Sequence, residues 1–204
     1  LYALQKLGPV ELRASGQVAK VDFSSNRDFE IDDLIYQIDG HWTGTSQAAS
    51  VSAVSELDLG WGYVRPEVSA DWFAIHQNPY SETGVSSSDS LYAHVSDVDT
   101  DELSVAANVV IGKQMQLGGG IARAELSGGY RSIASETPYA ASVSFGDIEN
   151  VFDLLAPDTA SDAVLLGVAL GGEGGLVSSK VGYDVKISDD GMAHVLGGTL
   201  RLKF

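Results

Sequence analysis

The chain has 204 residues, a length that suits one folded domain rather than two. Its 28 acidic and 12 basic residues give a formal charge of −16, which excludes attraction to a polyanion, so we expect no nucleic-acid partner. The sequence has no cysteine and no run of about 18 apolar residues, which excludes disulfides, thiolate metal sites and a transmembrane helix.

Alternation of apolar and polar residues predicts strands of about ten residues, the length with which a tilted strand crosses a bilayer. In 177–187, for example, Val181 and Tyr183 share one face, whereas Lys180 and Asp184 share the other. A soluble β-sandwich alternates in the same way, so this pattern alone does not decide the class. In chain order, the predicted strands are residues 10–23, 50–61, 64–72, 103–111, 120–131, 162–171, 177–187 and 196–204.

The connections between these segments are of two kinds. Outer-membrane barrels have short turns on the periplasmic side and long loops outside. The sequence therefore predicts an all-β, antiparallel transmembrane β-barrel of the outer membrane, with about eight strands in this chain. The tight, glycine-rich turns are 59–62, 113–120 and 171–175, and the longer polar connections are 25–40, 78–100, 132–161 and 187–191.

Two of the long connections carry much of the negative charge. Residues 81–102 hold six acids and residues 147–162 hold five, and neither segment contains Lys or Arg. We interpret them as solvated acidic loops, with divalent-cation binding as the alternative.

In a barrel, the polar positions of the strands line an enclosed, wet lumen, where side chains of both charges form networks. Glu67 near Arg65 and Glu125 near Arg123 fit such a network better than they fit an acid/base pair. The residues predicted to face the lumen are Arg65, Glu67, Asp71, Arg123, Glu125, Lys180, Asp184, Lys186 and Arg201.

The sequence offers no constellation for catalysis. Its four histidines lie in loops and at strand ends without metal-ligand spacing, at His41, His76, His94 and His194. Gly118-Gly119-Gly120 fits a turn, and no Gly-x-Ser-x-Gly elbow is present. We expect no enzymatic activity, no metal site and no cofactor.

The last predicted strand ends on an aromatic residue. Leu200, Leu202 and Phe204 occupy every second position, with Arg201 and Lys203 between them. This ending is similar to the β-signal by which the outer-membrane barrel assembly machinery recognises its clients, and it offers a strand edge with an apolar face.

Most of the chain resembles the autotransporter β-domain of type V secretion. The resemblance rests on segments that are weak singly but stand in the family's order. It implies a twelve-stranded barrel with an N-terminal helix in its lumen, which anchors in the outer membrane of a Gram-negative bacterium and helps export a fused passenger domain to the cell surface. These segments are Asn26-Arg27-Asp28-Phe29-Glu30-Ile31, Asp39-Gly40-His41-Trp42-Thr43-Gly44, Tyr63-Val64-Arg65-Pro66-Glu67-Val68, Tyr80-Ser81-Glu82-Thr83-Gly84, Glu125-Leu126-Ser127-Gly128-Gly129-Tyr130-Arg131, Ala140-Ala141-Ser142-Val143-Ser144-Phe145, Ala163-Val164-Leu165-Leu166-Gly167-Val168 and Gly182-Tyr183-Asp184.

The resemblance implies outer-membrane lipids, the assembly machinery and the chain's own passenger domain as partners. With about eight strands, we expect residues 1–204 to be one translocator domain in which the first four strands and the lumen helix of the family are missing. An eight-stranded barrel is filled by its own side chains, so export requires further strands. We also expected the terminal strand to pair with the first strand. The alternatives are a complete eight-stranded barrel with a structural or surface-binding role and a soluble β-sandwich adhesin module.

Overall fold

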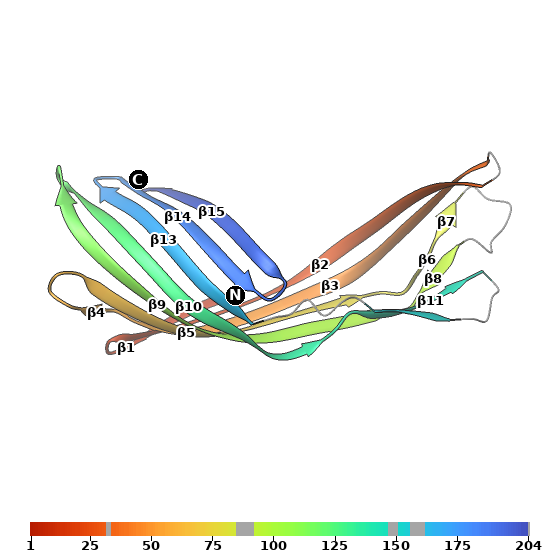
Figure 1. Cartoon of the computed structure of the whole chain (residues 1–204), viewed down its shortest axis with the longest axis horizontal. Coiled ribbons are helices and arrows are strands. Elements are labelled where there is room, and N and C mark those ends of the chain that lie inside the picture. The colour runs from red at the N-terminus through yellow and green to blue at the C-terminus, as the bar shows by residue number, and fades with distance from the viewer. Residues whose placement is uncertain (32–33, 85–91, 147–150, 156–161, 204) are drawn as a thin grey trace.

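In the computed structural model of the chain (Figure 1), the described residues are 1–31, 34–84, 92–146, 151–155 and 162–203. Among them, no helix is long and apolar enough to cross a membrane. The strands are β1 (Tyr2–Leu7), β2 (Val10–Ile31), β3 (Leu34–Ser55), β4 (Leu57–Asp58), β5 (Tyr63–Gln77), β6 (Tyr80–Ser81), β7 (Thr83–Gly84), β8 (Ala93–Val95), β9 (Val98–Leu117), β10 (Gly120–Thr137), β11 (Ala140–Phe145), β12 (Phe152–Leu155), β13 (Ala163–Gly174), β14 (Val177–Ser188) and β15 (Gly191–Leu202).

The main sheet follows the order β1-β2-β3-β5-β9-β10-β13-β14-β15, and every neighbouring pair is antiparallel. The prediction of an all-β, antiparallel fold is confirmed. The path contains nine strands rather than about eight. The additional strand is β1, a six-residue strand that is too short for the ten-residue pattern that we sought in the sequence.

Tight turns join the strands at one end of the sheet, which we call the turn end. Gly118 and Gly119 form a two-residue turn between Leu117 and Gly120, with φ values of 54° and 85°. Turns of this kind suit the right-handed twist of the paired strands and need positive φ, which glycine adopts without steric cost. At 59–62 the amide of Leu59 donates to the carbonyl of Gly62 at 2.8 Å.

The opposite end, which we call the loop end, is more ordered than the sequence predicted. β2 and β3 pair without interruption from Val10 opposite Ser55 to Ile31 opposite Leu34, so most of the segment 25–40 is a hairpin. β12, β11, β8 and β6 form a second, four-stranded sheet there. Arg27 Nε donates to Glu82 at 3.0 Å and connects the hairpin to this region. Strands that extend into water need no apolar face, so their sequences resemble loops.

The prediction of a long connection at 187–191 was wrong. Ser188 pairs with Gly191, which leaves only Asp189 and Asp190 in the turn between β14 and β15. A run of Asp and Gly is polar whether it forms a loop or a two-residue hairpin turn, so polarity alone did not distinguish the two.

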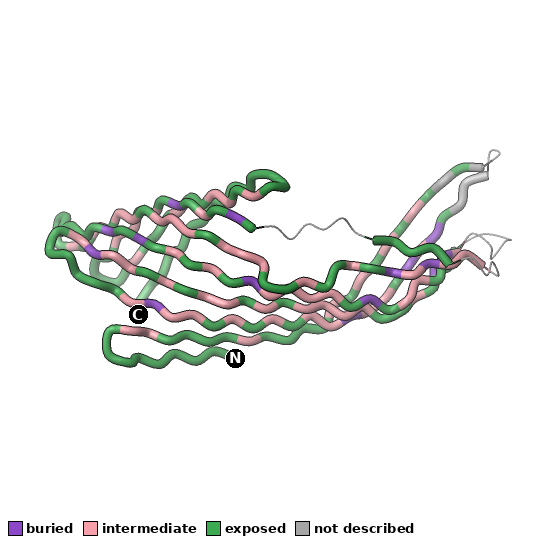
Figure 2. Tube along the Cα trace, turned by 60° about the horizontal axis from the view of Figure 1, so that its bottom comes forward, coloured by how far each residue is buried: buried purple, intermediate pink, exposed green. Residues whose placement is uncertain are grey.

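From β2 to β15 the register places the alternating apolar positions of the strands on one face, which we call the outer face. Val51 lies opposite Ala70, which lies opposite Val105. The residues opposite Val168 on its two neighbouring strands are likewise apolar. The outer face is open: Val68 is 56% exposed, Val168 52%, Val181 57% and Leu200 68%. Exposed residues alternate with less exposed ones along much of the strands between the two edges, whereas β1 and β15 are exposed throughout (Figure 2). No second sheet or helix among the described residues covers these positions, so a β-sandwich does not describe the fold.

The sheet is curled (Figure 1). Its polar face is the concave, inner face, since ion pairs on that face join β5, β10 and β14 across the strands between them. The inner face is sheltered in the middle of the sheet, for example at Ser104 with 2% and Val110 with 6% exposure on β9. The curl does not close, because in the described part of the chain β15 pairs with β14 alone and β1 with β2 alone. The nine strands form an open half-barrel, and the expected pairing of the last strand with the first strand of a complete barrel stays a prediction.

Candidate functional site

The candidate site is the polar wall on the inner face of the curled sheet. Strand positions directly opposite each other in an antiparallel pair point to the same side. Arg123 lies opposite Gly171, Gly171 opposite Lys180, and Lys180 opposite Thr199. The same rule puts every residue that we predicted to face the lumen on the inner face, namely Arg65, Glu67, Asp71, Arg123, Glu125, Lys180, Asp184, Lys186 and Arg201.

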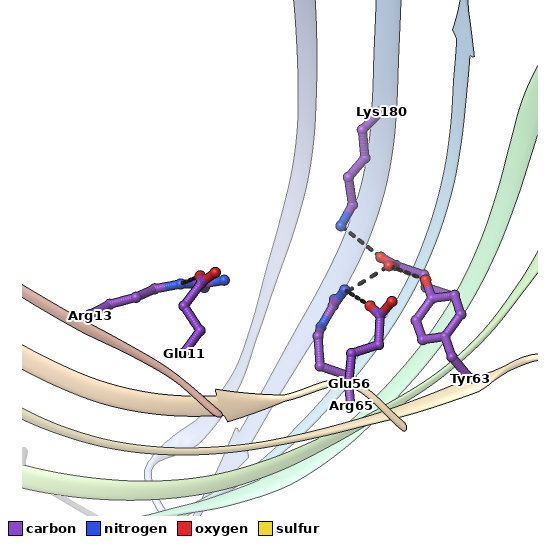
Figure 3. A network of polar contacts seen from close by, with 7 residues as sticks. Glu11, Arg13, Glu56, Tyr63, Arg65 and Lys180 are labelled. Carbon is purple, nitrogen blue, oxygen red and sulfur yellow. Dashed lines mark hydrogen bonds and ion pairs between the residues drawn. The ribbon is translucent and has the colours of Figure 1, made fainter. Parts of the chain in front are cut away.

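Glu125 is the centre of a network near the turn end. Figure 3 labels its partners Tyr63, Arg65 and Lys180. Tyr63 Oη donates to Glu125 Oε1 at 2.6 Å, and Lys180 Nζ donates to Oε2 at 2.7 Å. Arg65 lies 3.3 Å from Glu125 Oε1 and 3.8 Å from Glu56. The Glu125 side chain is 10% exposed, so its charge is largely removed from bulk water and is balanced by these donors.

These contacts depend on the curl. Arg65 is on β5, Glu125 on β10 and Lys180 on β14, and one strand separates each neighbouring pair of them. Neighbouring strands are about 4.8 Å apart, so each contact crosses about 10 Å of sheet. Long side chains on the concave face converge across that distance, whereas those on the convex face diverge. The network therefore exists only on the inner face.

Two further predicted residues, Arg123 and Arg201, line a cavity of about 340 Å³ together with Arg65, Glu125 and Lys180. Neither Arg123 nor Arg201 has a carboxylate within ion-pair distance among the described residues. Glu173, also in the lining, pairs with Lys203 at 2.6 Å. The structure thus brings together five of the nine predicted residues.

The other four predicted residues lie elsewhere on the wall. Asp71 accepts hydrogen bonds from Ser50 at 2.6 Å and from Ser69 at 3.1 Å. Asp184 lies over Gly167, where a Cβ would meet its carboxylate. Glu67 and Lys186 make no side-chain hydrogen bond or ion pair with the described residues.

Sequence reasoning missed the role of Tyr63. Tyr63 is 5% exposed and covers Gly112, where a Cβ would overlap the ring. Gly112 lies directly opposite Tyr63 in the ladder between β5 and β9. The signal for this contact is a glycine opposite a large residue, which becomes visible only when the register is known.

Three of the four histidines form cross-strand pairs. Ser81 Oγ lies 2.7 Å from His94 Nδ1, Tyr183 Oη 2.7 Å from His194 Nδ1, and Asp99 2.8 Å from His76 Nδ1. The Asp99 hydrogen bond raises the pKa of His76, which lies near the loop end of β5. Within the described ranges, no group of three or more His, Asp or Glu residues is arranged to hold a metal ion.

The predicted assembly signal lies at an open edge of the sheet. Leu200 and Leu202 point to the outer face and are 68% and 58% exposed. Beyond β15, the amide of Lys203 donates to the carbonyl of Leu176 at 2.8 Å. Phe204 lies outside the described residues.

The family model of the autotransporter β-domain matches residues 1–184. The matched range contains every strand of the main path from β1 to β13 and most of β14. No individually curated protein is similar enough to the chain to count as a relative. Members of the matched family are outer-membrane translocator barrels of type V secretion rather than catalytic domains. With its family match, its curled antiparallel sheet and its exposed apolar outer face, the chain belongs to the autotransporter β-domain family.

Proposed function

We propose that this chain is part of a translocator barrel that sits in the outer membrane of a Gram-negative bacterium and helps export a passenger domain, fused on its N-terminal side, to the cell surface. The observation that carries the proposal is the continuous apolar outer face. In water such a face is a liability, because it exposes far more contiguous apolar surface than a soluble monomer tolerates. Against acyl chains it is the stable arrangement.

The polar inner wall supports a transport role. Charged side chains on the concave face keep water inside the curl, so an extended polypeptide would meet a hydrated surface and would not adhere to apolar side chains. The wall needs no chemistry for this task. The whole of residues 1–204 serves as one translocator domain in this proposal, completed by further strands.

Three partners follow from the proposal: outer-membrane lipids on the outer face, the passenger domain along the inner wall, and the barrel assembly machinery at the edge of β15. The exposed apolar face of Leu200 and Leu202 and the unpaired β15 edge are the features on which a strand of the machinery would pair by β-augmentation.

The experiment follows the full-length protein in intact cells. We expect the chain in the outer-membrane fraction, with a gel mobility that changes on boiling, and the upstream polypeptide accessible to added protease. A protein recovered from the aqueous phase without detergent, or an upstream segment protected from protease in cells that carry a folded barrel, would contradict the proposal.

A matched pair of variants tests the assembly edge. Leu202→Ser changes the apolar outer face of β15, whereas Lys203→Ser changes the position next to it. We expect Leu202→Ser to lower the amount of heat-modifiable barrel in the membrane and Lys203→Ser to leave it near the wild-type amount. Equal amounts for the two variants would refute recognition of this face.

A further inference from the structure

The cavity near the turn end concentrates positive charge in a strongly acidic chain. Four cationic side chains line it, Arg65, Arg123, Lys180 and Arg201, out of the 12 Lys and Arg residues of a chain with charge −16. Two carboxylates, Glu125 and Glu173, lie in the same lining. The lining therefore carries four positive and two negative charges, a net charge of +2.

The internal ion pairs do not use all of these cations. Arg65 and Lys180 share Glu125, at 3.3 Å and 2.7 Å. Glu173 is paired with Lys203 at 2.6 Å. Arg123 and Arg201 lie near enough to Glu173 to act on its charge, but neither has a carboxylate within ion-pair distance in the described part of the chain, and Glu173 is itself bonded to Lys203. These two guanidinium groups are therefore the cations of the lining that no ion pair occupies.

The backbone leaves room between these two groups. Gly171 lies on the inner face between Arg123 and Lys180 and contributes no side chain to the cavity. Arg123 is on β10 and Arg201 on β15, three strand spacings apart, or about 14 Å in a flat sheet. The sheet curls inward, and both arginines line the same cavity on its concave face. Ser178 and Thr199 place hydroxyl groups in the same lining.

We propose that this cavity binds a phosphate-class oxyanion between Arg123 and Arg201. A guanidinium group presents its donors in a planar fork that matches phosphate oxygens, and charge-assisted hydrogen bonds of this kind are stronger than neutral ones. A net charge of +2 matches a phosphate dianion better than a single carboxylate. The hydroxyl groups of Ser178 and Thr199 supply additional donors. The site does not depend on passenger export.

The same chemistry reaches the cavity from two sources, free phosphate and the phosphodiester headgroup of a lipid. Both are tested by isothermal titration calorimetry of the full chain, refolded in octyl glucoside at low ionic strength. The probes are inorganic phosphate and dihexanoyl-phosphatidylglycerol below its micellar concentration. Saturable binding of phosphate alone supports the proposal with free phosphate as ligand, and tighter binding of the diester supports it with the headgroup as ligand. If neither probe binds, the proposal is overturned.

Variants locate the site. Arg123→Gln and Arg201→Gln should each weaken binding of the preferred probe by about tenfold or more, because each removes a charge-assisted contact. Lys186→Gln is the matched control: it removes one positive charge from the inner face of β14 but does not line the cavity. Circular dichroism and the mobility change on boiling establish that each variant is folded. Equal affinity in the folded double variant and the wild type would overturn the proposal, whatever the result of the export assay.

Discussion

Placing an arginine at Val68 tests directly whether the outer face meets lipid. Val68 lies on the outer face of β5 and is 56% exposed. Val68 is five residues from Tyr63, the first residue of β5 at the turn end. The path between them along the strand is about 17 Å. A strand tilt of about 40° reduces this path to a depth of about 13 Å, half of an apolar band about 25 Å tall. Val68 is thus placed near the middle of the membrane.

The environment of the outer face sets the expected cost. An arginine at the bilayer midplane of a barrel's lipid face costs about 2–4 kcal/mol, which lowers the equilibrium constant for folding by about thirtyfold to nearly a thousandfold. In water, the same substitution at an exposed position changes stability by about 0.5 kcal/mol or less. The two environments therefore predict results that differ by well over 1 kcal/mol.

The matched control is Ser69→Arg, the same change one residue along the strand. Ser69 is on the inner face, where its hydroxyl lies 3.1 Å from Asp71, so an arginine there meets water and a carboxylate. The assay is urea unfolding and refolding of the chain in phospholipid vesicles, followed by tryptophan fluorescence. We expect Val68→Arg to lose about 2–4 kcal/mol and Ser69→Arg to remain within about 1 kcal/mol of the wild type. Equal losses for the two variants would refute the assignment of the two faces.

Three further predictions concern the inner wall, the turns and the loop end. Glu125→Gln removes the shared partner of Lys180 and Arg65 and should cost about 2 kcal/mol in the same unfolding assay. Glu67→Gln breaks no such contact and should cost less than about 0.5 kcal/mol. Gly119→Val forces a β-branched residue to a φ of 85° and should cost about 1–3 kcal/mol. Gly197→Val is an inner-face change with no atom within 4 Å of the added Cβ, and it should cost less. The reverse order of the two costs would contradict the turn geometry. The Asp99 hydrogen bond, with the nearby charge of Asp97, raises the pKa of His76 above 6.5. The pair therefore stabilises the fold fully below about pH 6.5, and this contribution is lost as the pH rises through the raised pKa. In an NMR titration, Asp99→Asn should return the pKa of His76 toward 6.5, and an unchanged pKa would exclude the pairing.

The open curl explains why the strand count matters for function. Nine strands bend far enough to bring side chains of β5, β10 and β14 together, but β1 and β15 are not joined in the described structure. The alternative of a complete eight-stranded barrel requires the first and last strands to pair, and the present sheet does not show that pairing. A translocator completed by further strands is consistent with both open edges.

The sequence alone determined the class of fold and the sides of the strands. Side chains alternate with a period of two, so the assignment of Val181 to one face and Lys180 to the other followed from position in the strand. Gly118 and Gly119 predicted a turn because tight hairpins need positive φ. The paired polar segments 25–31 and 34–40 and the turn at 189–190 were not predictable in this way, because polarity is shared by loops, water-exposed strands and turns.

The tertiary structure decided which residues meet. Tyr63 and Gly112 are neighbours only because of the register between β5 and β9, and Arg65, Glu125 and Lys180 meet only because the sheet curls. Neither the register nor the curvature is encoded in the alternation of a single strand, which is the same for any partner and for a flat or a curved sheet. The sequence therefore supplied the charges of the inner wall, and the curvature of the sheet joined them into a network.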